Sequence, residues 1–363
     1  MLATRRHFLA ASGSTLALAT PATAQDIQSL TLATAWPRGA PGVGVNAERF
    51  ARRVEALSGG RLSIRLFGAG ELVPAFEVLD AVQRGTADLG HGTAYYWSGK
   101  QQALHYFTGV PFGLTAVEFV AWLRFGGGQA LWDKVMAPFG VVPFYAGSSG
   151  PQAGGWFRRE ITSPEDFLGL KFRIAGLGAQ VLRRMGTTTV TTPPGEIYGA
   201  LASGAVDGAD WVGPWNDIAF GLHKVAPYYY LPGFHEPGPG LEILVNRKRF
   251  EGLAPDLQEV LRSAAEATAL ETLADFTYHN IRTFAELETT YGVTPRHFPP
   301  AVIERLAAES RAVLKALAQR NSLTAKVWES YGAFLDQARA YAPFSELGSL
   351  ATREAAGSMV RKD

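Results

Sequence analysis

Gly85-Thr86-Ala87-Asp88-Leu89-Gly90 is the stretch that decides the fold of this chain. Its first glycine ends a segment with helical spacing that begins at Glu71, and a short apolar stretch follows, which predicts a helix leading into a strand. The same alternation occurs upstream, where 30–35 and 62–67 have the composition of strands and 46–57 has apolar residues at helical spacing. This order of strands and helices predicts an open α/β sheet with helices on its faces.

A similar stretch occurs in the second half of the chain as Gly204-Ala205-Val206-Asp207-Gly208-Ala209. Both stretches follow a helical segment that starts with Gly, Glu and an apolar residue, at 70–72 and at 195–197. A glycine helix stop followed by Asp and a strand is common in α/β proteins, so the repeat alone proves little. Two copies nevertheless suit a protein that is built from two similar lobes.

Further expected strands indicate how the two lobes are connected. Strands are predicted at 140–146, 172–174 and 241–246, so the chain crosses between the lobes more than once. We therefore predict a two-lobed fold with interleaved lobes, each an open mixed sheet flanked by helices, plus long C-terminal helices. The expected boundaries are 25–145 mainly for lobe 1, 146–239 mainly for lobe 2, 240–254 for a crossover strand that returns toward lobe 1, and 255–363 for the helices.

The last third of the chain predicts long helices at 255–288, 301–319 and 324–341. Such helices either pack on their own chain or form an interface with a partner subunit, and packing on the lobes is the favoured interpretation.

Composition excludes several classes of function. The chain has 363 residues, enough for two domains, and 34 basic against 33 acidic residues, so there is no basic excess for binding nucleic acid. It contains no cysteine, which removes disulfides, thiolate metal sites and a cysteine nucleophile. Gly-x-Ser-x-Gly, His-Glu-x-x-His and phosphate-binding glycine motifs are missing from the sequence, and the seven histidines lack metal-ligand spacing. We expect no enzyme and no organic cofactor.

The N-terminus predicts export. Arg5 and Arg6 precede a short apolar stretch at 8–18, and Ala22 and Ala24 are the small residues that a signal peptidase selects. The apolar stretch is too short to span a membrane, and the paired arginines are typical of a twin-arginine signal. We predict that 1–24 is a signal peptide, that cleavage follows Ala24, and that the mature protein is periplasmic.

Four regions have polar residues in unusual places. The stretch 208–217 puts a carboxylate (Asp210), two indoles (Trp211 and Trp215) and an amide (Asn216) at the end of a predicted strand, where open α/β sheets bind ligands. Arg173 lies in a strand between two core residues and needs an anion, for which a carboxylate is the best geometric match. A buried aromatic turn and a surface ion pair are the competing interpretations. The other two regions contain Gln152 and Glu236. Together with Asp210 they would form an oxygen-only set suited to Na⁺ or Ca²⁺, although their spacing in the sequence does not by itself group them.

Three motifs together identify a family resemblance: 85–90, the helix end at 51–60 with the strand start at 62–64, and Leu168-Gly169-Leu170-Lys171-Phe172-Arg173. The chain resembles the substrate-binding subunit of tripartite ATP-independent periplasmic (TRAP) transporters, the DctP-type family, over essentially the whole mature chain. The resemblance implies that the two interleaved lobes form a periplasmic binding protein fold. The carboxylate-binding arginine of that family corresponds to Arg173.

The stretches 210–214 and 235–238 are similar to the subgroup that binds 2-oxo acids such as pyruvate, or 2-hydroxy acids such as lactate, together with a cation. The resemblance implies a cation held by the side chains of Gln152, Asp210 and Glu236 and by the backbone oxygen of Trp211. Family members can have glutamate where this chain has Asp210, which leaves the choice between Na⁺ and Ca²⁺ open.

The same resemblance implies the remaining partners. A small organic carboxylate is expected to bind Arg173. From their places at the ends of predicted strands, we expect Tyr95 and Tyr96 to close the other side of the pocket, with Gln152, Trp211, Trp215 and Asn216 beside the ligand. The partners would be TRAP membrane permease subunits, and a homodimer could form through the C-terminal helices. A periplasmic sensor or scaffold that docks to a receptor is the alternative, followed by a cation-dependent oxo-acid lyase.

Overall fold

The computed structural model describes residues 27–357. The predicted signal peptide, including its cleavage after Ala24, lies outside the described residues. Within 27–357, no helix has both the length and the apolar character that crossing a membrane requires.

The first lobe is a mixed sheet of five strands in the order β2-β1-β3-β10-β4. Its strands are β1 (Gln28–Thr34), β2 (Leu62–Phe67), β3 (Leu89–Gly92), β4 (Val141–Gly147) and β10 (Leu241–Asn246). The first three are mutually parallel, while β10 lies antiparallel between β3 and β4. The helices of this part of the chain are α1 (Val43–Leu57), α2 (Val78–Arg84), α3 (Ala116–Phe125), α4 (Gly128–Met136) and α8 (Arg247–Glu251).

The second lobe is a mixed sheet of six short strands in the order β11-β9-β5-β8-β6-β7. Its strands are β5 (Gly155–Phe157), β6 (Lys171–Arg173), β7 (Thr188–Val190), β8 (Gly208–Ala209), β9 (Tyr228–Tyr230) and β11 (Pro295–Arg296). The helices α5 (Gly176–Arg184), α6 (Ile197–Ala202) and α7 (Pro214–Ala219) come from the same part of the chain. Short 3-10 helices connect the elements of both lobes: η1 (Ala75–Glu77), η2 (Ala94–Trp97), η3 (Gln102–Phe107), η4 (Ala137–Phe139), η5 (Pro164–Phe167), η6 (Pro194–Glu196), η7 (Leu222–Lys224) and η8 (Ala342–Phe344).

The repeated sequence stretch has the same structural role in both lobes. The Asp88 carboxylate accepts a hydrogen bond from the backbone N–H of Thr31, and the Asp207 carboxylate accepts one from the N–H of Lys171, both at 2.8 Å. The backbone N–H of each aspartate donates in return to the carbonyl oxygen of the same partner. Each aspartate therefore fixes the start of a strand against a parallel neighbour, which explains why the motif occurs once per lobe.

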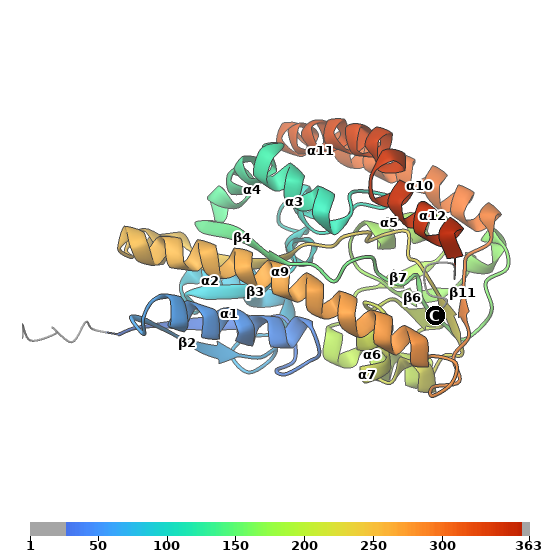
Figure 1. The fold of residues 1–363 in the computed structure, drawn as a ribbon, viewed down its shortest axis with the longest axis horizontal. Helices are drawn as coiled ribbons and strands as arrows, with labels where there is room; N and C mark the ends of the chain where they lie inside the picture. The colour runs from blue at the N-terminus through green and yellow to red at the C-terminus, as the bar shows by residue number, and fades with distance from the viewer. Residues whose placement is uncertain (1–26, 358–363) are drawn as a thin grey trace, which may run out of the picture.

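The long helix α9 (Pro255–Glu286) runs along both lobes (Figure 1). It packs on α1 and β4 of the first lobe and on α7 of the second. The predicted helix at 255–288 is confirmed, as are its two successors, α10 (Pro300–Ala318) and α11 (Ser322–Tyr341). α10 packs on α5, and α11 packs on α10 and on η3. A final helix, α12 (Glu346–Ala356), follows η8. The chain between α9 and α10 also supplies β11, a strand that the sequence did not predict.

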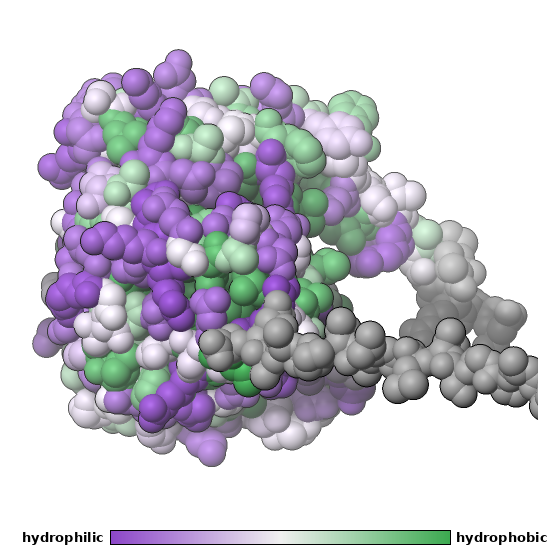
Figure 2. All heavy atoms as spheres, turned by 90° about the vertical axis from the view of Figure 1, so that its left-hand side faces the viewer, coloured by the Kyte–Doolittle hydropathy of each residue, from purple (hydrophilic) through white to green (hydrophobic). Residues whose placement is uncertain are grey.

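Stacked aromatic rings fill the core of each lobe. In the first lobe Phe107 stacks on Trp132 with ring centroids 5.1 Å apart, and in the second Trp156 stacks on Tyr229 at 4.0 Å. At the end of the molecule that carries β2 and the start of α9, apolar side chains form separate patches among polar ones (Figure 2). The apolar residues are thus largely used to build the two lobes.

One predicted helix is shorter than expected. Helical spacing predicted a helix from Glu71 to Arg84, but α2 begins only at Val78, after the short η1. Pro74 explains the difference, because it has no N–H to donate and it pushes the preceding residue toward an extended conformation. Residues 71–73 form a turn instead, in which the N–H of Gly70 donates to the carbonyl oxygen of Val73.

Candidate functional site

A small cavity lies where the two lobes meet. Its volume is about 20 Å³, room for little more than one water molecule. It is lined from the first lobe by residues that follow β1 and β3, and from the second by residues that follow β8 and β9. This is the position in which α/β sheets bind ligands, beyond the ends of their strands. The lining residues are Trp36, Val43, Thr93, Tyr95, Tyr96, Ser149, Gln152, Trp211, Val212, Glu236, Pro239 and Leu241.

Direct contacts between the lobes show that the described conformation is closed. The Asn216 amide donates to the carbonyl oxygen of Pro41 at 2.7 Å, and the Gln180 amide nitrogen lies 3.2 Å from His105 Nε2. Tyr95 reaches Gly176, where a Cβ would lie only 2.9 Å from the tyrosine ring. Gly176 also has a φ of 63°, so a side chain here would be strained as well as crowded.

Arg173 is a buried cation that stands directly behind the cavity. It ends β6, is 1% exposed, and its guanidinium carbon lies 5.7 Å from the centre of the Trp211 ring. Its Nη1 donates to Asp210 Oδ1 at 2.9 Å and to the Asp210 carbonyl oxygen at 3.0 Å, while Nη2 donates to the Thr192 carbonyl oxygen at 3.1 Å. Burial alone would lower the pKa of Arg173, but Asp210 and the nearby tyrosines Tyr96 and Tyr95 outweigh it and raise the pKa.

Asp210 joins this arginine to a histidine. Asp210 is 2% exposed, and its Oδ2 lies 3.2 Å from His235 Nε2. Burial acts to lower the pKa of His235, yet the hydrogen bond and charge of Asp210 raise it above its usual value. The two oxygens of Asp210 are thus shared between Arg173 and His235, so this carboxylate is held in place from both sides.

Glu236 lines the cavity with a carboxyl group whose hydrogen-bonding capacity is only partly used by the described residues. Its Oε2 is buried and has no hydrogen-bond partner among the described residues. Burial raises the pKa of Glu236 to about 7, and His235 partly opposes that shift. A buried acceptor without a partner is unfavourable by about 1–3 kcal/mol, so this oxygen is well placed for a bound group.

Asp217 fixes the loop that carries Trp211. Its Oδ1 accepts the backbone N–H groups of Val212 and Gly213 at 2.9 and 3.0 Å, and its Oδ2 accepts Trp156 Nε1 and the Tyr229 hydroxyl. Burial raises the pKa of Asp217 to about 6, although each of the four hydrogen bonds that Asp217 accepts acts to lower this pKa. The loop at the end of β8 is therefore anchored to the core of the second lobe.

The structure brings most of the residues predicted from the sequence to one place. Gln152, Tyr95, Tyr96, Trp211 and Glu236 line the cavity. Arg173 and Asp210 lie next to it as a buried pair.

Two of the predicted residues lie elsewhere. Trp215 stacks on His279 of α9 with ring centroids 4.2 Å apart and does not line the cavity. Asn216, which donates to Pro41, belongs to the contact between the lobes.

Sequence reasoning missed two residues of this region. Trp36 lines the cavity and His235 contacts Asp210, although neither was among the site residues predicted from the sequence. For Trp36 a signal was available, since an indole directly after the first strand satisfies the same strand-end argument that pointed to Asp210. The contact between His235 and Asp210 depends on two distant loops meeting and has no sequence signal.

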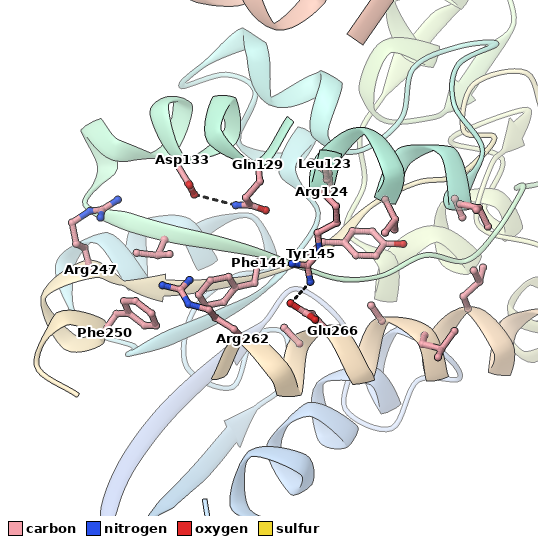
Figure 3. A pocket seen from close by; sticks show the side chains of 18 of the residues that line it. Leu123, Arg124, Gln129, Asp133, Phe144, Tyr145, Arg247, Phe250, Arg262 and Glu266 are labelled. Carbon is pink, nitrogen blue, oxygen red and sulfur yellow. Dashed lines mark hydrogen bonds and ion pairs between the residues drawn. The ribbon is translucent and has the colours of Figure 1, made fainter. Parts of the chain in front are cut away.

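A second, larger groove shares no lining residue with the cavity. It has a volume of about 610 Å³ and lies on the first lobe between α3, α4, β4 and α9 (Figure 3). Apolar side chains such as Phe144 and Phe250 line it, and Arg124 of α3 pairs with Glu266 of α9 across it. The charged pair Arg124 and Glu266 at this groove is about half exposed, whereas Gln152 and Glu236 at the cavity between the lobes are buried, so we place the functional site at the cavity.

Comparison with protein families gives a match over most of the chain. Residues 32–321 match the bacterial extracellular solute-binding protein family 7, DctP. The chain belongs to this family. It is a family of solute-binding proteins, so the chain is a binding protein and not an enzyme. The chain is also 41% identical to a monocarboxylate 2-oxoacid-binding periplasmic protein of Nostoc sp. PCC 7120, over 87% of this chain and 86% of the relative.

Solved structures of TRAP solute-binding proteins share the fold. A protein from Colwellia psychrerythraea with bound calcium and pyruvate superposes with a TM-score of 0.87 at 36% identity, over 90% of this chain and 100% of the other. One from Pseudoalteromonas atlantica with sodium and pyruvate gives 0.87 at 35%, over 90% and 99%. One from Bordetella bronchiseptica, a dimer of mixed occupancy with calcium and picolinate, gives 0.90 at 32%, over 93% and 100%. The two-lobed fold predicted from the sequence is confirmed.

The oxygen atoms at the cavity fit a hard cation such as those in the related structures. Glu236 supplies a buried oxygen without a partner, and the Gln152 amide nitrogen points to Ser149 Oγ at 3.4 Å, which leaves the amide oxygen for other use. No N–H of the described residues donates to the Trp211 carbonyl oxygen. Among residues 27–357 no cluster of three or more His, Asp or Glu is placed to hold a metal, so a cation here would draw on amide and backbone oxygens as well as carboxylates.

Proposed function

We propose that this chain captures a small 2-oxo monocarboxylate such as pyruvate, or the corresponding 2-hydroxy acid, between its lobes and delivers it to a TRAP membrane permease. One observation carries the proposal: a fully buried arginine, Arg173, stands beside a closed cavity whose walls contain buried polar atoms that have no hydrogen-bond partner in the described part of the chain. An arginine fork binds a carboxylate through two parallel hydrogen bonds. The ligands bound in the related structures are consistent with this chemistry.

Arg173 is the residue proposed to take the ligand carboxylate. In the described conformation its Nη1 is engaged by Asp210, so an entering carboxylate competes with the Asp210 side chain for the guanidinium. The bond of Asp210 to His235 holds Asp210 close by when that competition occurs. Tyr95 and Tyr96 close the cavity from the first lobe, and the Tyr96 hydroxyl, which has no hydrogen-bond partner within residues 27–357, can donate to a ligand oxygen.

Charge balance supports a cation in this site. Arg173 and a monocarboxylate cancel, which leaves the carboxylate of Asp210 and, when it is ionised, that of Glu236 near an anionic ligand, and His235 beside Asp210 offsets this negative charge in part. Without further compensation these carboxylates would repel the ligand. A bound Na⁺ or Ca²⁺ would supply the missing positive charge and bridge ligand oxygens, held by Gln152, Asp210, the backbone oxygen of Trp211 and Glu236.

Three further assignments belong to the same proposal. The mature protein would begin after Ala24 and reach the periplasm by the twin-arginine route, on the strength of Arg5 and Arg6. The permease subunits would recognise the closed lobes.

A homodimer would form through the C-terminal helices, where apolar side chains face solvent. Phe344 is 85% exposed and Leu347 is 59% exposed, and on α9 Leu270, Ile281 and Phe284 are exposed as well. Exposed apolar residues that gather on long helices favour an interface, and the related Bordetella protein is a dimer.

Calorimetric titration tests the proposal. Mature protein, stripped of metal with a chelator, is titrated with pyruvate alone, with Na⁺ and with Ca²⁺. We expect tight binding that depends on one of the cations. If no 2-oxo or 2-hydroxy acid binds under any cation, the ligand assignment is wrong even though the family assignment stands.

A further inference from the structure

Trp36 of the first lobe faces Trp211 of the second lobe across the cavity. The centres of the two indoles are 6.2 Å apart. The Tyr96 ring lies 5.6 Å from Trp36 on the same lobe. These three rings line one cavity, and the guanidinium carbon of Arg173 lies 5.7 Å from the centre of the Trp211 ring. A ligand whose carboxylate binds Arg173 would therefore direct the rest of its chain toward the wall formed by Trp36.

The position of Trp36 is fixed by its own lobe. Its backbone N–H donates to Thr34 Oγ1 at 3.3 Å and its carbonyl oxygen accepts from the N–H of Ala69 at 2.9 Å. The ring packs edge to face on His91, which is itself held between Thr34 and Asn46. A side chain that is held in this way cannot move aside easily, so its volume limits what the cavity accepts.

The indole N–H of Trp36 is buried and has no hydrogen-bond partner among the described residues. The same is true of Trp211 Nε1, Tyr96 Oη and Glu236 Oε2, and all four residues line the cavity. Buried polar groups in native proteins are almost always paired. Four exceptions around one small cavity indicate that their partner is a bound polar molecule, and Trp36 supplies one of the donors.

We propose that Trp36 contacts the ligand and determines specificity: its ring limits the ligand to a short side chain, and its indole N–H donates to a ligand oxygen. This inference rests on the proposed function, because it names the residue that selects among 2-oxo acids. The cavity is already small with both lobes closed, so even a modest ligand displaces its walls. A branched side chain would require the Trp36 ring to leave its packing on His91.

Two substitutions separate the effects of size and hydrogen bonding. Trp36→Phe removes the N–H and some volume, and Trp36→Leu removes more volume. Binding of pyruvate and of 4-methyl-2-oxopentanoate is measured by calorimetry in saturating Na⁺ or Ca²⁺. We expect wild type to prefer pyruvate, Trp36→Phe to weaken pyruvate binding about 2- to 10-fold, and Trp36→Leu to shift the preference toward the branched acid by at least about tenfold. The ratio of the two affinities is informative because general destabilisation would not change it selectively.

Trp132→Phe is the matched control. Trp132 lies in the same lobe, is fully buried and also has an unpartnered indole N–H, but it stacks on Phe107 away from the cavity. This variant should leave both affinities and their ratio unchanged. If folded Trp36→Leu and Trp36→Phe keep the wild-type ratio, or if Trp132→Phe changes it equally, the role assigned to Trp36 is wrong while pyruvate binding stands. If wild type binds neither acid, both the proposed function and this inference are rejected.

Discussion

Replacing Arg173 by methionine separates the two roles that the structure gives this residue. The change removes the guanidinium but keeps a side chain of similar length. In the ligand-free protein it leaves Asp210 buried with only His235 as a partner. Deleting one partner of a buried ion pair costs about 3–5 kcal/mol, so we expect a marked drop in the free energy of unfolding. Ligand binding should weaken by at least about 2 kcal/mol, which is roughly 30-fold in Kd.

The double variant Arg173→Met, Asp210→Asn distinguishes stability from binding. Neutralising Asp210 removes the uncompensated charge, so we expect most of the lost stability to return in a urea titration. Affinity for pyruvate should not return, because the partner of its carboxylate is still missing.

Calorimetry on both variants at a temperature where each is folded measures the second effect, and Arg173→Lys shows how much of it depends on the planar fork. If Arg173→Met binds pyruvate as tightly as wild type, the ligand carboxylate does not bind Arg173 and the reasoning fails.

Three further changes probe the surroundings of the site. The Oε1 of Glu242 accepts the Trp97 indole N–H, and burial raises the pKa of Glu242 to about 8. Between about pH 4.5 and 8 the folded protein therefore holds a proton that the unfolded chain has lost. The contribution of Glu242 to stability is complete below about pH 4.5 and disappears as the pH rises toward 8. Glu242→Gln should therefore reduce the fall in the free energy of unfolding between pH 5 and 8, measured by urea titration, by up to about 1.4 kcal/mol per pH unit. An unchanged slope would show that Glu242 does not cause this pH dependence. Asp217→Asn replaces one of the two acceptor oxygens by an NH₂ group, which then faces two of the four donors that Asp217 binds. It should lower the free energy of unfolding, measured by thermal denaturation, by about 2–4 kcal/mol. A loss below about 0.5 kcal/mol would mean that the loop after β8 is held in another way. Asn216→Ala removes the hydrogen bond to Pro41 and should raise the ligand dissociation rate about 2- to 10-fold in stopped-flow tryptophan fluorescence, whereas an unchanged rate would remove Asn216 from the closing contacts.

The sequence predicted the elements whose pattern is local. The strands at 62–67 and 241–246 have the predicted bounds, since a run of apolar and β-branched residues between turn residues decides them. The buried position of Arg173 was also readable, because it lies in a short strand between two core residues. The helix predicted from Glu71 begins only after Pro74, at Val78. The prediction followed the periodic apolar pattern and gave too little weight to proline as a helix breaker.

The details of the site depended on distant residues and could not be predicted. Asp210 binds Arg173 and His235 at once, and nothing in the spacing of these three residues indicates it. Asn216 follows Trp211 closely in the chain, yet its side chain turns to Pro41 of the other lobe. Which side of a short turn faces the cavity is decided by how the lobes pack, and that information is not local.

A crystal structure of the mature protein grown with pyruvate and Ca²⁺ tests the central claim most directly. We expect density for the acid between the lobes, with its carboxylate on the Arg173 guanidinium and a cation in contact with Glu236 and Gln152. Asp210 should have moved off Arg173 Nη1. If pyruvate binds between closed lobes without contacting Arg173, or if it is found outside the cavity lined by Trp36, Tyr96 and Trp211, the account of this site is contradicted.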